Sequence, residues 1–168
     1  MATRDGLYAK FGITAEAAQL FETSLGTVLL AATGLGKSWH TVPDPEAGRK
    51  VLQSIEKNTL GQLLRKVRSV VDIDDETIAI LESALHTRNR LMHGFYERHN
   101  FHIQTDEGRD QMLADLEAMH DELFTAWRIV SALESVLLEH LVRLKLPADK
   151  SGDDPVTKIA FNVRKQSQ

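Results

Sequence analysis

The chain has 168 residues, of which 42% are hydrophobic and 26% are charged, with a formal net charge of -4 and no cysteine. This composition is typical of a soluble globular domain, and it excludes disulfide bonds, thiolate metal sites and a cysteine nucleophile. Because the net charge is negative, binding to nucleic acid would require a local basic patch.

Neither a signal peptide nor a membrane span is expected. The opening MATRDGLYAKFG lacks the apolar run of a secretory signal, and no segment approaches the ~20 apolar residues of a membrane span. Since cysteine is also absent, we expect a cytoplasmic protein with no membrane partner.

Residues 1–146 are expected to form a single all-α domain, an up-and-down bundle of four to five helices. Apolar residues recur at helical spacing, and no alternating strand pattern or internal repeat is present. The first helix is predicted to begin at Thr14, acting as the N-cap, and to end near Gly34 or Gly36.

The middle of the chain predicts a loop and two helices. Two prolines and a glycine in residues 38–48 indicate a loop, and a short helix is predicted over residues 49–57. Asn58 or Thr59 can cap the next helix, which runs through residues 59–71 with leucine and valine at helical spacing.

Two long helices and a tail follow. The acidic residues in 72–75 favour a helix start, and a long helix is predicted over residues 78–99. Thr105 begins the longest helix, which extends to about Lys145. Residues 147–168 open on turn residues and end basic, so they are predicted to be a loosely attached C-terminal tail.

The segment TGLGKS, residues 33–38, resembles a nucleotide-binding loop but lacks two of its features. Ala31 stands where that loop requires a glycine, and a helix precedes the segment in place of a strand. We therefore predict a helix C-terminus capped by glycine, and no cofactor is expected.

The segment RNRLMHGFY, residues 88–96, places cationic side chains on a helix that should face the core. At about 100° per residue, Arg88 falls at the centre of an apolar band. The band consists of Ile78, Leu81, Leu85, Met92 and Phe95. An unpaired guanidinium is costly in a dry core, so either a carboxylate from Glu82 or a neighbouring helix pairs with Arg88, or the band opens onto a cleft or subunit interface.

His93 lies at the edge of this band, with Asn89 one turn before it. Glu82, His86 and Tyr96 are predicted on the same side. A histidine in this place can be structural, or it can act together with Arg88.

The spacing of arginine, four residues and histidine, with a polar residue directly after the arginine, resembles the motif of the HEPN superfamily of helical domains. Arg88, Asn89 and His93 are the residues that match it. The order of helices over residues 14–145 also resembles that family. The resemblance implies a homodimer in which two such motifs face one another across a cleft.

The activity that this resemblance implies is that of a metal-independent endoribonuclease in a bacterial toxin or phage-defence system. RNA would be cut by attack of a ribose 2′-hydroxyl, with His93 transferring protons and Arg88 holding the phosphate. Asn89 would position the phosphate or the imidazole. An antitoxin or a sensor protein would be the regulatory partner.

The resemblance departs from the family at one place and leaves alternatives open. In some HEPN toxins a tyrosine two residues after the histidine is modified, whereas Phe95 stands there and Tyr96 follows. A catalytically silent HEPN-like module for dimerisation or for binding nucleotide or RNA is the first alternative. A plain helical scaffold, with Arg88 closed off by a carboxylate, is the second.

Other basic residues and histidines are weaker indications of an RNA-binding surface or a metal site. A run of basic residues, together with Arg90 and Arg98, could form an RNA-binding face or an ordinary solvated surface. The run comprises Lys57, Arg65, Lys66 and Arg68. His93, His99 and His102 match no established ligand spacing, so no metal site is predicted.

Overall fold

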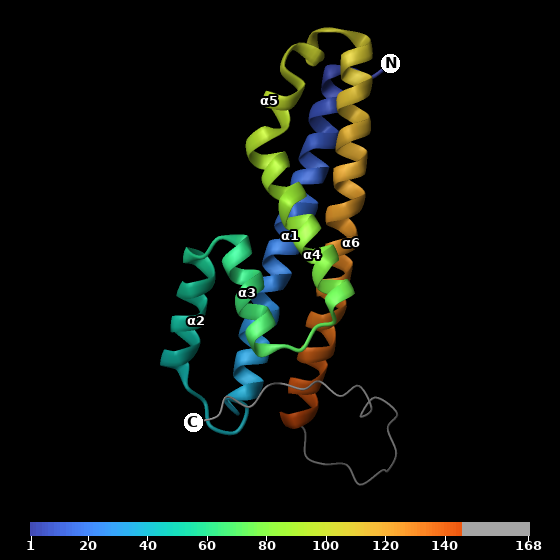
Figure 1. Cartoon of the computed structure of the whole chain (residues 1–168). Helices are drawn as coiled ribbons and strands as arrows, with labels where there is room; N and C mark the ends of the chain where they lie inside the picture. The colour runs from blue at the N-terminus through green and yellow to red at the C-terminus, as the bar shows by residue number, and fades with distance from the viewer. Residues whose placement is uncertain (146–168) are drawn as a thin grey trace, which may run out of the picture. The chain divides into compact units, whose positions relative to one another are not determined.

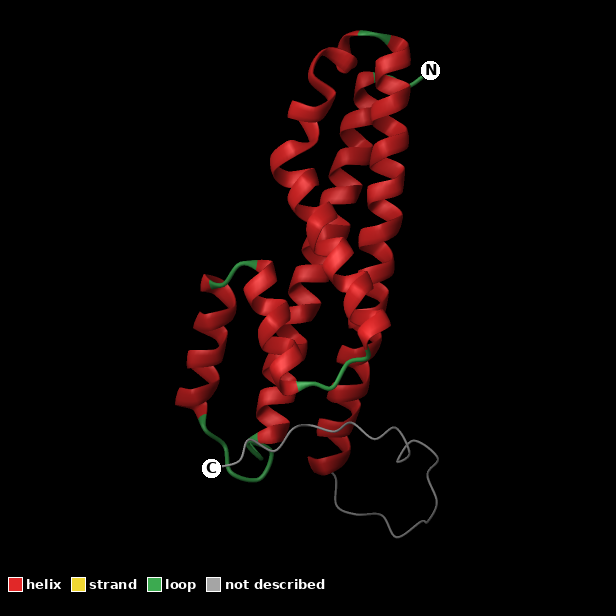
Figure 2. Cartoon of the chain, viewed as in Figure 1, coloured by secondary structure: helices red, strands yellow, loops and turns green. Residues whose placement is uncertain are grey.

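The computed structural model describes residues 1–145, so the predicted tail at 147–168 lies outside the described residues. Helices account for almost all of residues 1–145 and no strand occurs there, which confirms the prediction of an all-α helical bundle (Figure 2). The elements are α1 (Arg4–Gly36), α2 (Pro45–Lys57), α3 (Leu60–Val70), α4 (Asp75–Asn89), a π-helical turn (Arg90–Gly94), α5 (Phe95–His99), a 3-10 turn (Asn100–Gln104) and α6 (Asp106–Lys145) (Figure 1). None of these helices is both long enough and apolar enough to cross a lipid bilayer.

The chain divides into two compact units. Unit 1 comprises Met1–Ser24 and Asp75–Ser131, and unit 2 comprises Leu25–Asp74 and, of the described residues, Ala132–Lys145. Each of α1 and α6 contributes residues to both units. The single domain expected over residues 1–146 stays a prediction.

Unit 1 is built from the first part of α1, the segment from α4 to α5, and the first part of α6. Its core contains the fully buried side chains of Leu7, Phe21, Leu81, Leu91, Phe95, Met112, Leu116, Met119 and Leu123. The predicted N-cap at Thr14 is wrong, because α1 already begins at Arg4. The buried Thr14 hydroxyl lies 2.9 Å from the Lys10 carbonyl oxygen and 3.4 Å from that of Leu116, so it serves α1 and the contact with α6.

Unit 2 contains the second part of α1, α2, α3 and the end of α6. The Thr59 side chain accepts from the Gln62 backbone N–H, and the Gln62 side chain accepts from the Thr59 N–H at 2.9 Å. This capping box confirms Thr59 as a helix start. α2 begins four residues before the expected position, because Pro45 suits the first helical turn and Asp44 accepts from the Ala47 N–H.

The end of α1 at Gly36 agrees with the prediction, but no glycine adopts the left-handed conformation there. Ser38 does, with a φ of 56°. The Trp39 N–H donates to the Gly34 carbonyl at 2.9 Å and the Ser38 N–H donates to that of Leu35 at 3.1 Å, the two bonds of a Schellman motif. The TGLGKS segment is thus a helix terminus, with serine in place of the predicted glycine.

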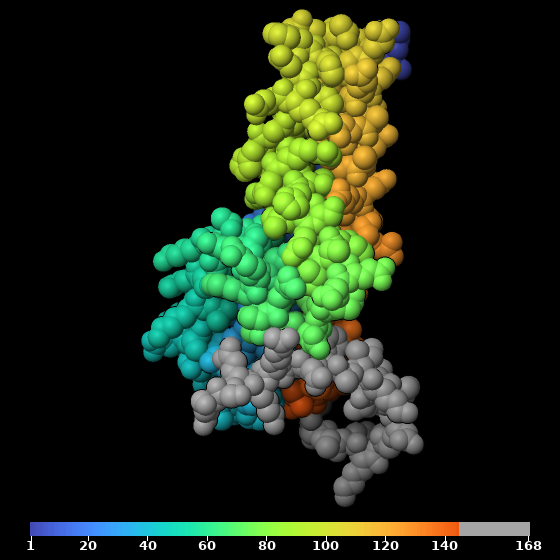
Figure 3. Space-filling model, in the orientation of Figure 1, coloured from blue at the N-terminus to red at the C-terminus, as the bar shows by residue number. Residues whose placement is uncertain are grey.

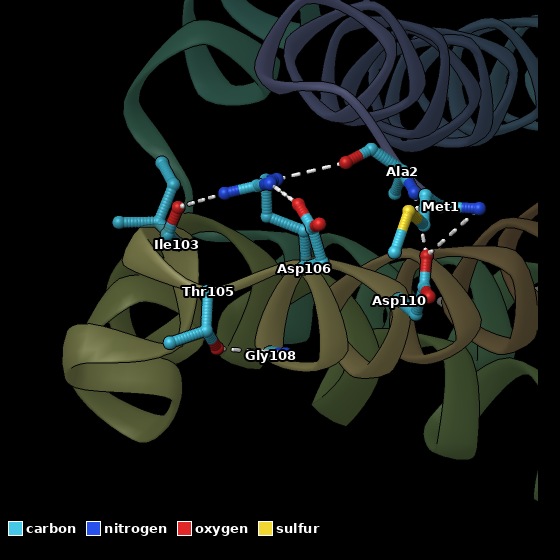
Figure 4. Close-up of polar contacts among 8 residues, drawn as sticks. Met1, Ala2, Ile103, Thr105, Asp106, Gly108 and Asp110 are labelled. Atoms are coloured by element: carbon cyan, nitrogen blue, oxygen red, sulfur yellow. Dashed lines mark hydrogen bonds and ion pairs between the residues drawn. The ribbon is translucent and has the colours of Figure 1, made fainter.

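The start of α6 is fixed by side-chain contacts (Figure 4). Thr105 caps the helix by accepting from the Gly108 N–H at 3.1 Å, as predicted for this residue. Arg109 donates to the Ala2 carbonyl at 2.8 Å and to the Ile103 carbonyl at 3.0 Å. The guanidinium therefore joins the N-terminal segment, the 3-10 turn and α6.

Gly108 is required by close packing against a backbone. A Cβ at this position would lie 2.6 Å from the Cα of His102 and still closer to its carbonyl oxygen. We predict that Gly108→Ala lowers the free energy of unfolding by about 1–3 kcal/mol, although alanine normally stabilises a helix interior relative to glycine. Urea denaturation followed by circular dichroism measures this effect. Gly12→Ala in α1, where a Cβ meets no neighbour within 4 Å, is the control, and an equal response of both variants would contradict the explanation.

Candidate functional site

Arg88 lies in the last turn of α4 and forms an ion pair with α1. Its Nη2 is 3.2 Å from Oε2 of Glu22, and its Nη1 is 3.3 Å from Oδ1 of Asn89. The Arg88 side chain remains 24% exposed. A carboxylate from a neighbouring helix therefore pairs with the guanidinium, one of the outcomes considered from the sequence, but the pair is open to solvent.

The predicted apolar band differs from the buried positions at two of its members, Leu85, which is half-buried, and Met92. The buried positions along this segment are Ile78, Leu81, Ala84, Thr87, Leu91 and Phe95, whereas Met92 is 46% exposed. At about 100° per residue, Arg88 falls on the same side of α4 as Leu81 and Ala84, and its side chain is half-buried.

Side-chain hydrogen bonds join α4 to α6. Glu122 of α6 accepts hydrogen bonds from the hydroxyls of Ser83 and Thr87, the latter at 2.6 Å. The side of α4 that carries Ser83 and Thr87 therefore faces Glu122 of α6. Periodicity within α4 alone could not identify this side, because threonine and alanine are weak signals of burial.

A π-helical turn over Arg90–Gly94 begins two residues after Arg88 and contains His93. In a continuous α-helix, side chains five residues apart point about 140° away from one another. A π turn closes hydrogen bonds between residues five apart, so it brings such positions nearer to the same side. The predicted single helix over residues 78–99 is thus interrupted within the motif.

The other polar residues of the motif are accessible to solvent. Asn89 and His93 are exposed, as are His86 and Tyr96. Asn89 accepts from Arg88, so it can orient the guanidinium. The structure thus leaves the imidazole of His93 and part of the Arg88 guanidinium accessible to a ligand.

Aromatic side chains gather on α1 and α5, next to the motif in the chain. The ring centroid of Tyr96 lies 5.5 Å from that of Phe11 and 5.3 Å from that of Phe95. Burial, and then the neighbouring Tyr8, raise the pKa of Tyr96 above its usual value of 10.0. Tyr8 and Phe11 precede the predicted start of the first helix, so their place beside Tyr96 could not be predicted from the sequence.

A second polar cluster joins the same segment to α6. His99 is buried, and its Nε2 lies 2.9 Å from Oδ2 of Asp115 while its Nδ1 lies 3.2 Å from Nδ1 of His102. Arg90 forms an ion pair with Asp115 at 3.3 Å, so it is not part of a free basic surface.

Two histidines of this cluster, His99 and His102, were considered above as possible metal ligands. Within residues 1–145, no group of three or more potential ligands has the geometry of a metal site. The cluster connects the end of α5 to α6 through a hydrogen-bonded chain of one carboxylate and two imidazoles.

Comparisons of the chain with protein-family models, with curated proteins and with solved structures find no match.

The strength of the ion pair between Arg88 and Glu22 can be measured as a coupling free energy. We predict a coupling of about 1 kcal/mol in a double-mutant cycle with Arg88→Ala and Glu22→Ala, because the pair is half-buried and joins two helices. The exposed pair of Lys50 and Glu46, at 2.9 Å within α2, is the control, for which about 0.3 kcal/mol is expected. Urea denaturation of the single and double variants measures both couplings. A coupling for the first pair no larger than that of the control would show that Glu22 does not hold Arg88 in solution.

Proposed function

We propose that this protein is a metal-independent endoribonuclease of the HEPN type, acting in a bacterial toxin or phage-defence system. The observation that supports it most is the combination of a partly exposed Arg88, two residues before a π turn, and an exposed His93 within that turn. Such turns occur frequently at functional sites.

The chemistry assigns one role to each residue of the motif. The neutral imidazole of His93 removes the proton from a ribose 2′-hydroxyl, and an imidazolium protonates the leaving oxygen. Arg88 holds the phosphate oxygens and stabilises the charge that develops on them. Asn89 orients the guanidinium through the contact at 3.3 Å. The products are a 2′,3′-cyclic phosphate and a 5′-hydroxyl.

A homodimer would supply the second histidine of this mechanism. Exposed side chains of Tyr8, Met92 and Tyr96 lie on α1, the π turn and α5 of unit 1, and Arg88 and His93 belong to the same unit. Figure 3 shows that α4 and α5, in green to yellow, form much of the visible face of unit 1. Exposed apolar side chains near a polar site are typical of a protein interface.

The second candidate is a catalytically silent module that binds RNA or nucleotide, or that only dimerises. The ion pair with Glu22 favours it, because a carboxylate 3.2 Å from the guanidinium competes with a phosphate for the same donors. For the ribonuclease to act, substrate phosphate must displace Glu22 or bind the remaining N–H groups of Arg88.

RNA cleavage in the presence of EDTA distinguishes the two candidates. We predict that the parent protein cuts single-stranded RNA but not an RNA with a 2′-deoxy substitution at the cut, and that His93→Ala lowers the rate by about 100-fold or more. Arg88→Ala is expected to lower the cleavage rate by a similar factor, and Asn89→Ala by a smaller one.

His86→Ala is the matched control, because His86 is exposed on the same segment. Cleavage by His93→Ala at the parent rate would refute the assignment. Retained RNA binding by a parent protein without cleavage would support the silent module.

The dimer has its own test. We predict that Met92→Glu converts a dimer to a monomer, because a charge at a buried interface position is strongly unfavourable, and that Val42→Glu in the loop before α2 leaves the dimer intact. Both side chains are exposed in the single chain, so neither substitution should unfold it. Light scattering measures the mass, and a monomeric parent protein at high concentration would contradict the dimer.

A further inference from the structure

Unit 2 contains a pocket that the proposed nuclease does not use. Its volume is about 440 Å³, and α1, α2, the loop between them and the end of α6 line it. Pockets that bind small molecules in other proteins have volumes in this range. The apolar walls are formed by Leu30, Trp39, Leu52, Leu138 and Leu141.

One wall of the pocket is held in place by the terminus of α1. The backbone N–H of Trp39 donates to the Gly34 carbonyl. A Cβ at Gly34 would lie 3.1 Å from Cε3 of the Trp39 indole. The ring therefore packs directly on the glycine backbone. This contact explains why a glycine stands within the last turns of the helix.

The apolar side of α2 is incompletely covered by the described chain. α2 buries none of its residues, although its valine, leucine and isoleucine fall on one side. Two leucines of the pocket wall, Leu52 and Leu138, are 46% and 42% exposed. An apolar molecule in the pocket would remove these surfaces from water, which is favourable.

The ionisable side chains of the pocket are basic. Arg49 and His40 line it, and no acidic side chain belongs to its lining in the described part of the chain. In addition, Nδ1 of His40 is buried without a hydrogen-bond partner among the described residues. A buried polar atom that lacks a partner carries a free-energy penalty, which a ligand's polar group can relieve after a small ring movement.

We propose that this pocket binds a small molecule with an apolar body and one carboxylate. The body lies against Trp39 and the leucines, and the carboxylate accepts hydrogen bonds from Arg49 at the mouth. A guanidinium suits a carboxylate because it can donate two parallel N–H bonds. Charge complementarity selects an anion over a neutral or cationic molecule of equal length.

Octanoate is the probe, and Trp39 is the reporter. In the full chain carrying Trp127→Phe, Trp39 is the only tryptophan. We predict a saturable change in its fluorescence with octanoate, at least 10-fold weaker binding of octan-1-ol, and none of octylamine. Arg49→Gln should weaken octanoate binding at least 10-fold and leave octan-1-ol binding unchanged.

Gly48→Leu blocks the pocket without a clash. Gly48 lines the pocket in the first turns of α2, and a Cβ there meets no atom within 4 Å. This variant should lose binding of octanoate, whereas Gly12→Leu, at an equally open site in unit 1, should retain it. Circular dichroism melting confirms that both variants are folded.

Three results would overturn the proposal. The first is no saturable response to octanoate, including the case in which another segment of the chain fills the pocket. The second is equal binding of octanoate, octan-1-ol and octylamine. The third is a fluorescence change that depends on protein concentration without ligand, which would indicate a second copy of the chain in the pocket.

Discussion

The carboxylate of Glu122 joins α4 to α6 in unit 1. It accepts from two hydroxyls one turn apart, Ser83 and Thr87, so one side of α4 is directed toward α6. Arg88 follows Thr87 directly, and with α4 in this rotation its guanidinium reaches Glu22 of α1. The end of α4 that carries Arg88 is therefore held by contacts with two other helices, through Glu22 of α1 and Glu122 of α6.

The π turn has a second effect on the same segment. It changes the rotation per residue between Arg88 and His93, so that Leu91 is buried while Met92 is exposed. Buried His99 and Arg90 both contact the half-buried Asp115, and these contacts fix the far end of the segment to α6. Contacts on both sides thus hold an irregular helix whose accessible groups are a guanidinium and an imidazole.

The two units offer different chemistry. Unit 1 presents donors suited to phosphate, at Arg88 and His93, together with exposed aromatic side chains. Unit 2 presents an apolar pocket with Arg49 at its edge. A phosphodiester needs positioned charge and proton transfer, whereas a small amphipathic anion needs apolar surface and one cationic group. These are independent requirements, and each can be lost by mutation without the other.

Local signals in the sequence determined the helical class, the starts of α3 and α6 at Thr59 and Thr105, and the end of α1 at Gly36. Each depends on residues within one or two turns, through caps and periodic apolar positions. Only the tertiary structure decided the partner of Arg88, since Glu22 lies 66 positions away in the chain. It also decided the inclusion of Thr14 within a helix and the burial of Leu91 in place of Met92. The physical reason is that burial and ion pairing depend on which surfaces of distant helices meet, and intrahelical periodicity carries no information about that choice.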